Sequence, residues 1–201
     1  IDLHDDEYHK FNSLKSYPYL PNSLKSNSVT GISKDKYGRL WISMFDGGVD
    51  VYDANSQTFT HLNNQKNTIA KGLNSLDITT IFIDSKFNTW VGTWNSGLYF
   101  LENDSKEFIN INTSTADSEF TSNRIMSFDE DSEGTIWIGT FLSGLYSYNS
   151  EKKLFKQHKS SEFLKYNINS SNIRKVLVDH DDNIWLGSRS GLYKVEKTKN
   201  E

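Results

Sequence analysis

The sequence predicts an all-β fold built from repeated units. Four tryptophans, Trp41, Trp90, Trp137 and Trp185, lie 49, 47 and 48 residues apart in the 201-residue chain, and a period of this size is typical of repeat architectures. Around each of them, short runs of β-branched and aromatic residues alternate with clusters of Asp, Gly, Asn and Ser. Such runs indicate strands separated by turns. No stretch has the pattern of an amphipathic helix.

Each unit has the same internal order. The first begins Val29-x-x-Ile32-x-x-Asp35-x-x-Gly38-x-x-Trp41, and the others begin at Ile78, Ile125 and Ile173. After the tryptophan come a small residue, a polar turn and a glycine, followed by an apolar and aromatic run; the glycines are Gly48, Gly97, Gly144 and Gly191. In the first three units a phenylalanine follows the glycine by eleven residues.

This order predicts four antiparallel strands per unit. In the first unit we expect an inner strand around Ile32, a second from Trp41, a third after Gly48 and an outer one at Phe59. Four strands in about 48 residues form one blade of a β-propeller. A single blade cannot cover both of its faces, so neighbouring blades stack radially, with the tryptophans and aliphatic residues between them.

The repeat phase divides the chain into one propeller segment, 1–201. We expect about four four-stranded blades: a partial blade at 1–20, blades at 21–68, 69–115 and 116–165, and a partial blade at 166–201. Ile1–Leu14 matches the second half of a blade, because the spacing from Ile1 to Phe11 repeats that from Val49 to Phe59. We interpret the chain as a piece of a larger propeller of about seven blades. The alternative is a closed four-bladed ring, in which residues 11–14 supply the missing outer strand.

The composition excludes some classes of binding partner. A net charge of −4, a pI near 5.8 and the lack of a basic stripe argue against nucleic acids. No segment approaches the roughly 20 apolar residues of a membrane span, so we expect membrane attachment only through segments outside this chain. The absence of cysteine excludes a disulfide scaffold.

One unit carries a family resemblance. The stretch Asp131-Ser-Glu-Gly-Thr-Ile-Trp-Ile-Gly-Thr-Phe-Leu-Ser-Gly-Leu-Tyr146 resembles the two-component regulator propeller repeat, which is typical of the sensor regions of hybrid two-component histidine kinases in Bacteroidetes-type bacteria. The resemblance extends over residues 1–196. It departs at Phe87 and Asp182, which replace the turn glycine, and at Ser43, which replaces the glycine after Trp41. We expect each departure to weaken a single turn.

The resemblance implies a function for the whole receptor. It implies a periplasmic sensor segment that binds a small carbohydrate ligand, often an oligosaccharide, and relays the signal to kinase and response-regulator modules outside this chain. It also implies a homodimer of the full-length receptor. The segment itself is expected to have no enzymatic activity.

Candidate ligand contacts lie on loops between the second and third strands. Four residues after each tryptophan stand Phe45, Trp94, Phe141 and Arg189, and polar Asp46 and Asn95 follow two of them. Exposed aromatic rings on loops could stack against a sugar ring. The alternative is that they attach the loop of one blade to the next blade.

A second group of candidates lies near the central channel, at the start of the inner strands. It comprises Asp77, Arg124, Arg174 and Lys175. Mixed charge at a channel could orient a polar or acidic sugar, whereas solvated rim charges are the alternative.

Other chemistry is weakly indicated. Asp129–Gly134 and Asp179–Asn183 loosely resemble a calcium loop, but turn chemistry explains both. The five histidines lack ligand spacing, so we expect no metal and no cofactor. Two alternative functions stay open. One is a propeller lyase or hydrolase acting on a polysaccharide or cyclic small molecule, with His158 and Glu162 as its acid–base pair. The other is a protein-interaction propeller that docks partners through Phe120 and Phe163–Leu164.

Overall fold

The chain folds into four antiparallel sheets. The computed structural model describes residues 13–62, 69–114, 120–158 and 171–196. The first sheet contains β1 (Val29–Lys34), β2 (Leu40–Met44), β3 (Gly48–Asp53) and β4 (Thr58–His61), and the second contains β5 (Ile78–Ile83), β6 (Thr89–Thr93), β7 (Leu98–Leu101) and β8 (Ile109–Ile111). The third contains β9 (Ile125–Glu130), β10 (Thr135–Thr140), β11 (Leu145–Asn149) and β12 (Leu154–His158), and the fourth contains β13 (Ile173–Val178), β14 (Ile184–Ser188) and β15 (Gly191–Val195).

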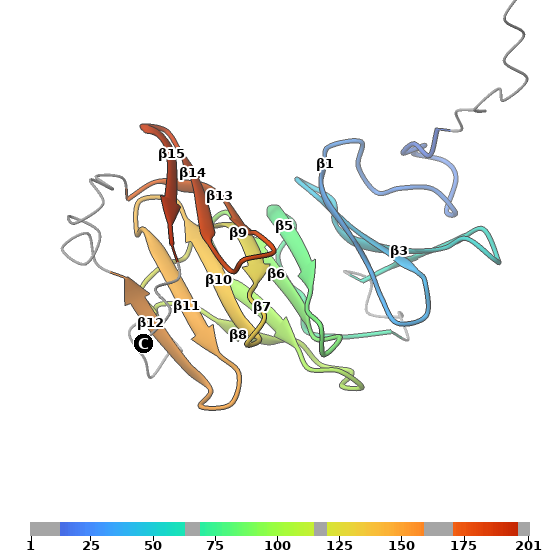
Figure 1. The fold of residues 1–201 in the computed structure, drawn as a ribbon. Helices are drawn as coiled ribbons and strands as arrows, with labels where there is room; N and C mark the ends of the chain where they lie inside the picture. Colours follow the sequence, from blue (N-terminus) through green and yellow to red (C-terminus); the bar gives the residue numbers. More distant parts are fainter. Residues whose placement is uncertain (1–12, 63–68, 115–119, 159–170, 197–201) are drawn as a thin grey trace, which may run out of the picture.

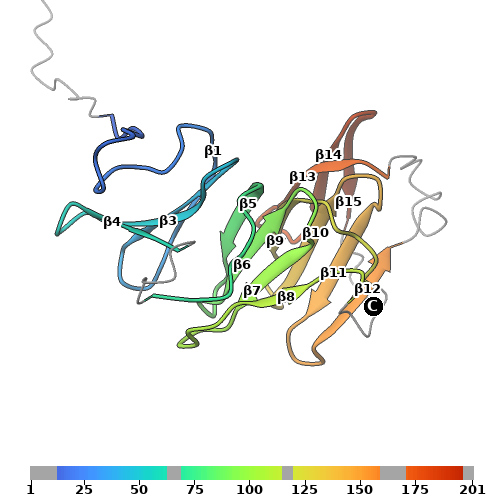
Figure 2. The ribbon, with the colours of Figure 1, turned by 180° about the vertical axis from the view of Figure 1, so that it is seen from behind.

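The sheets stand side by side in chain order, like blades of a propeller (Figures 1 and 2). This arrangement confirms the predicted all-β propeller fold. Neighbouring sheets contact one another in chain order through β1 and β5, β5 and β9, and β9 and β13, and in both views the second sheet lies between the first sheet and the fourth. The described residues therefore form an open arc and not the alternative closed ring. Residues 1–12 of the expected partial blade lie outside the described residues, and residues 13–20 form no strand. The described residues contain no α-helix, and therefore none that could cross a membrane.

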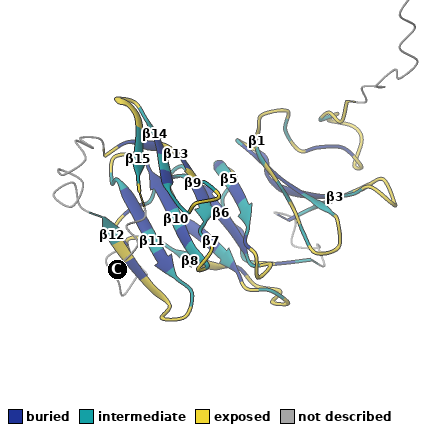
Figure 3. Cartoon of the chain, in the orientation of Figure 1, coloured by how far each residue is buried: buried dark blue, intermediate teal, exposed yellow. Residues whose placement is uncertain are grey.

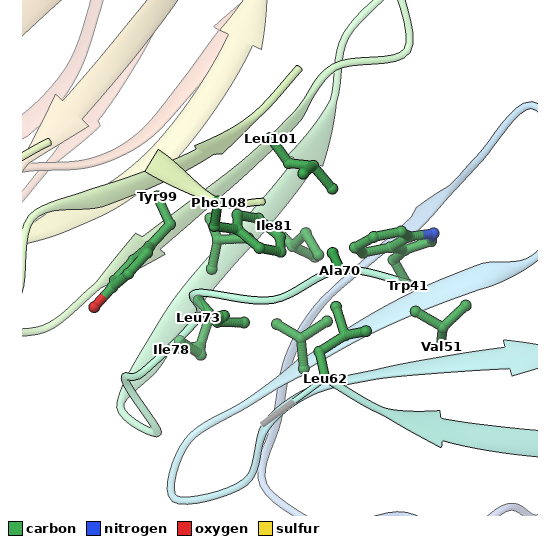
Figure 4. Packing of buried hydrophobic residues seen from close by; sticks show 12 residues of the cluster. Trp41, Val51, Leu62, Ala70, Leu73, Ile78, Ile81, Tyr99, Leu101 and Phe108 are labelled. Atoms are coloured by element: carbon green, nitrogen blue, oxygen red, sulfur yellow. The ribbon is translucent and has the colours of Figure 1, made fainter. Parts of the chain in front are cut away.

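The hydrophobic core lies between neighbouring blades (Figure 3). Trp41, only 3% exposed, packs with Ile81, Leu101 and Phe108 of the second blade (Figure 4). In the next interface Trp90, 1% exposed, packs with residues of the third blade. Burying an aromatic side chain of 150–250 Å² stabilises the fold by about 4–6 kcal/mol, as an upper estimate.

An aspartate in each blade fixes the tryptophan and the turn before it. The indole N–H donates to the carboxylate six residues earlier, from Trp41 to Asp35 at 3.0 Å and from Trp90 to Asp84 at 2.9 Å. The two remaining blades repeat this bond at 2.9 Å and 2.8 Å. The same carboxylates accept backbone N–H groups two and four residues further along. The shared spacing of aspartate and tryptophan is therefore a structural requirement of the turn.

The turn glycine occupies a left-handed position that other residues also adopt. Gly38 has φ 82° and Gly134 has φ 77°, while Phe87 and Asp182 hold φ 64° and 60° at the equivalent positions. Each of these turns keeps its hydrogen bond to the aspartate carbonyl three residues earlier. The two replacements thus keep the turn but place residues with a Cβ in a region that favours glycine.

The Ser43 departure is compensated across the strands. Ser43 pairs with Gly31, whereas in the second blade Gly92 pairs with Thr80. A Cβ on Gly31 would lie 3.0 Å from the Ser43 Oγ, and one on Gly92 would lie 2.7 Å from the Thr80 Cγ2. Each of these pairs has room for only one side chain. The glycine of the pair lies on the inner strand in the first blade and on the second strand in the second blade.

Candidate functional site

The loops that carry the predicted aromatic residues are hydrogen-bonded to the starts of inner strands. Trp94 N–H donates to the Asp77 carbonyl at 3.0 Å, and Phe141 N–H donates to the Arg124 carbonyl at 3.0 Å. Gly97, at the end of the Trp94 loop, donates its N–H to the Asn123 carbonyl of the next blade at 2.9 Å. Backbone bonds therefore hold this loop rim against two blades at once.

Three of the predicted residues come together across the second and third blades. The rings of Trp94 and Phe141 have centroids 5.2 Å apart and planes tilted by 46°. The Arg124 guanidinium carbon lies 5.4 Å from the Trp94 centroid and 5.6 Å from that of Phe141. We call Trp94, Arg124 and Phe141 the rim cluster. Such cation–π contacts contribute about 0.5–2 kcal/mol each.

The rim cluster connects the second and third blades, which is the packing role that was the alternative inferred from the sequence. It also leaves N–H donors of Arg124 available. No carboxylate of the described residues forms an ion pair with Arg124. A guanidinium has five N–H donors in a fixed fork. The rings hold Arg124 in place, and its unpaired donors can bind a hydroxyl or carboxylate oxygen.

The other predicted residues lie outside this cluster. Within the described part of the chain, Phe45 and Arg189 make no ring or cation contact with it, and Arg189 is exposed. Asp46 and Asn95 are exposed at their loops, and Asp77 is half-buried. Arg174 and Lys175 are exposed on β13. The structure therefore forms a compact cluster over two blades and does not bring together the predicted loop residues of all four blades.

The calcium-like stretches contain the turn between the first two strands of the third and fourth blades, and Asp129 and Glu130 of the first stretch end β9. Asp179 accepts N–H groups from Asp181, Asn183 and the Trp185 indole. The hydrogen bond from Trp185, and those from Asn183, hold the pKa of Asp179 well below its usual value. Asp179, His180 and Asp181 offer ligand atoms within 4.8 Å of one another, but the Asp179 oxygens already serve the turn. This matches the turn chemistry inferred from the sequence.

Phe120 is not a docking residue. It is 1% exposed and packs on Tyr146 and Phe155, with ring centroids 5.1 and 4.8 Å away, so its predicted place in an exposed apolar patch is wrong. The sequence contains the signal that was missed, because Leu24, Leu73 and Phe120 each precede a repeat tryptophan by 17 residues and all are buried. Phe163–Leu164 lie outside the described residues.

The proposed acid–base pair is not assembled by the described residues. The His158 ring lies 5.0 Å from that of Trp137, and its Nε2 is 2.8 Å from the Ser147 hydroxyl. These contacts give His158 a packing role at the edge of the third blade. Glu162 lies outside the described residues.

A buried acid–base pair in the first blade was not predicted. Asp50, fully buried, lies 2.7 Å from His61 Nδ1 and accepts the Lys25 N–H at 2.9 Å. His61 Nε2 lies 3.0 Å from the Pro21 carbonyl oxygen. Burial raises the pKa of Asp50, although the hydrogen bonds from His61 and Lys25 oppose the rise. The pair therefore attaches the segment before β1 to the blade, and we call Asp50 and His61 the clasp.

The sequence signal for this clasp is a break in the repeat. The positions of Asp50 and His61, which pair across the strands, carry Tyr99 and Asn110 in the second blade. In the third blade they carry Tyr146 and Gln157, and the Tyr146 hydroxyl meets that of Thr121 at 2.8 Å. In the third blade the phenol of Tyr146 thus contacts the segment that precedes the inner strand. In the first blade the carboxylate of Asp50, together with His61, takes its place.

Radial stacking, four-stranded blades and the Asp–Trp turn define this chain as a segment of a β-propeller. Residues 23–46 and 119–141 match the family described as two component regulator propeller. The chain therefore contains at least two stretches that match the two-component regulator propeller repeat.

Known proteins extend this similarity beyond the two matched repeats. The chain is 34% identical over 193 residues, or 90% of its length, to Histidine kinase P4 of Formosa agariphila, of which it spans 13%. It also matches the extracellular domain of the hybrid two component system BT3049 from Bacteroides thetaiotaomicron, with a TM-score of 0.68 and 27% identity over 89% of this chain and 23% of that one. The extracellular domain of BT4673 from the same organism shares the fold, with a TM-score of 0.65 and 22% identity over 86% of this chain and 23% of that one. By sequence and fold, the chain corresponds to part of the extracellular sensor region of a two-component system.

Proposed function

We propose that this chain is part of the ligand-sensing region of a hybrid two-component histidine kinase, located in the periplasm, and that its ligand is an oligosaccharide. The relay to kinase and response-regulator modules, and the homodimer, belong to the whole receptor, of which this chain would be a short part. The similarity to Histidine kinase P4 and to the extracellular domain of BT3049 supports this assignment.

The rim cluster supports a binding role within the chain. Trp94 and Phe141 offer aromatic surface, which suits the apolar face of a sugar ring. Arg124 supplies donors to hydroxyl or carboxylate oxygens, and no acidic group among the described residues neutralises it. The single observation that carries the proposal is this arginine, held over two rings at 5.4 and 5.6 Å on a loop rim.

Calorimetric titration tests the proposal. The chain is titrated with a panel of neutral and acidic oligosaccharides, alongside the variants Trp94→Ala and Arg124→Ala. We expect heat from at least one oligosaccharide and a loss of affinity of tenfold or more in both variants, since each removes about 1.4 kcal/mol or more of binding energy. Tyr19→Ala is the control, because Tyr19 is 94% exposed and lies outside the rim cluster.

Two results would contradict the proposal. If no oligosaccharide gave heat on titration, the proposal of a carbohydrate ligand would be refuted. A large fall in the melting temperature of Trp94→Ala, with affinity unchanged, would assign the rings to stapling of the blades alone.

A further inference from the structure

A groove lies between the first two blades, at the end opposite the rim cluster. The groove has a volume of about 330 Å³ and is lined by the β1–β2, β5–β6 and β7–β8 turns. The Trp94 loop joins β6 to β7. Because successive strands are antiparallel, that loop lies at the other end of the sheets.

Two exposed aromatic rings stand on adjacent turns of this groove. Tyr37, on the β1–β2 turn, is 65% exposed, and Phe87, on the β5–β6 turn, is 45% exposed. Trp41 and Leu101, both buried, also line the groove. The other units carry no aromatic residue at either of these two turn positions. The groove is therefore specific to the first two blades among those described.

Phe87 is one of seven non-glycine residues with positive φ among those described. Its φ of 64° is left-handed, at the position that is glycine in the first and third blades. A bulky residue in this region is strained, and a half-exposed ring offsets little of that strain by burial. Strained positions of this kind point to function when packing does not explain them.

The charged groups around the groove largely neutralise one another. Arg39 Nε lies 2.7 Å from Asp35 Oδ2, and Lys36 bridges from the first blade to Asn103 and Asp104 of the second. The Lys36 bridge connects the two walls of the groove. The lining contains three acidic and three basic side chains, so it carries no net charge.

Arg39 keeps unused donors. Its Nε bonds Asp35, and its guanidinium lies 5.0 Å from the Tyr37 centroid. Within the described residues its terminal nitrogens have no hydrogen-bond partner. They are positioned to donate to oxygen atoms of a molecule bound beside Tyr37.

We propose that this groove binds an uncharged sugar ring, which stacks on Phe87 and accepts hydrogen bonds from Arg39. The volume lies at the small end of ligand pockets and fits one or two sugar residues. The balanced charge favours an uncharged ligand over an acidic one. The groove is separate from the rim cluster, so this inference does not rest on the proposed function.

Saturation-transfer NMR tests the groove. The probes are methyl glycosides of glucose, galactose, mannose and xylose at millimolar concentration, with glucuronate and galacturonate as charged comparisons. We expect transfer to at least one uncharged glycoside, reduced at least fivefold in Phe87→Gly and in Tyr37→Ala. The melting temperature of Phe87→Gly should not fall, because glycine suits this backbone.

Leu142→Gly is the matched control. Leu142 is also apolar, left-handed at φ 73° and 59% exposed, but it does not line the groove. We expect this variant to retain the transfer.

Several results would overturn the inference. They are absence of transfer to every uncharged glycoside, stronger transfer to the uronates, retention of transfer in both groove variants, and a marked loss of stability in Phe87→Gly. Transfer that is lost in Trp94→Ala and kept in Phe87→Gly would place binding at the rim, overturning the groove while leaving the proposed function standing.

Discussion

Replacing Gly92 with alanine should destabilise the interface between the second and third blades. The added Cβ would lie 2.7 Å from Thr80 Cγ2 and 2.8 and 2.9 Å from Ile125 Cγ2 and Cβ. Both neighbours are β-branched and stiff at χ1, and Ile125 belongs to the next blade, so the blades must shift to make room. Overpacking of this kind costs about 1–3 kcal/mol, which corresponds to a melting temperature lower by about 2–12 °C for a chain of this size.

Gly187→Ala is the matched control at the equivalent position of the fourth blade. There the added Cβ would meet its nearest atoms, Lys175 Cβ and O, at 3.5 and 3.7 Å. We expect no loss and a gain of up to about 1 kcal/mol, because glycine within a strand is less stable than alanine. Urea unfolding followed by tryptophan fluorescence measures both variants. Equal losses in the two variants, or an unchanged midpoint in Gly92→Ala, would refute the contact argument.

Three further predictions concern buried groups. Asp84→Ala should lower the free energy of unfolding in urea by about 2–4 kcal/mol, because it leaves the buried Trp90 indole N–H unpaired and removes the turn acceptor. In a Trp90→Phe background this loss should be smaller. An equal loss in both backgrounds would contradict a stabilising role for the hydrogen bond from Trp90 to Asp84. Phe120→Ala should cost about 3–5 kcal/mol, whereas a residue of an exposed patch would cost almost nothing. Burial raises the pKa of Asp50 above 3.8, so its contribution to stability is present below that pH and is lost as the pH rises through the folded pKa. Unfolding measured from about pH 3.5 to 6 should therefore show the wild type losing stability relative to Asp50→Asn as the pH rises, and parallel profiles would contradict this.

Sequence alone predicted the fold because its determinants are local and periodic. The Asp–Trp spacing and the glycine before each third strand set turn and register within one blade, as the bond from Trp90 to Asp84 shows. The strand pattern around Ile32 and Trp41 needs no knowledge of neighbouring blades. Each of the four blades formed in this way has apolar faces that it cannot cover by itself. Stacking the blades against one another buries these faces.

The candidate site was only partly predictable, because it depends on how blades sit against each other. The loop position of Trp94 and Phe141 follows from the repeat, but Arg124 lies over both rings only through the placement of the third blade against the second. The groove was missed for the same reason. Its signal was available, since Phe87 stands where the first and third units have glycine, yet nothing local shows that Tyr37 lines the same groove.

The division between periodic and aperiodic residues has a physical basis. A residue repeated in every blade meets nearly the same neighbours each time, and those neighbours use up its bonding capacity, as Asp84 does for Trp90. The side chain of a residue that breaks the repeat, such as Arg124 or Phe87, has no partner supplied by the repeat and keeps donors or ring surface available. Substitutions at periodic positions should therefore change stability with little direct effect on affinity. Substitutions at positions that break the repeat should do the reverse, except where, as at Asp50, the break forms a buried clasp of its own.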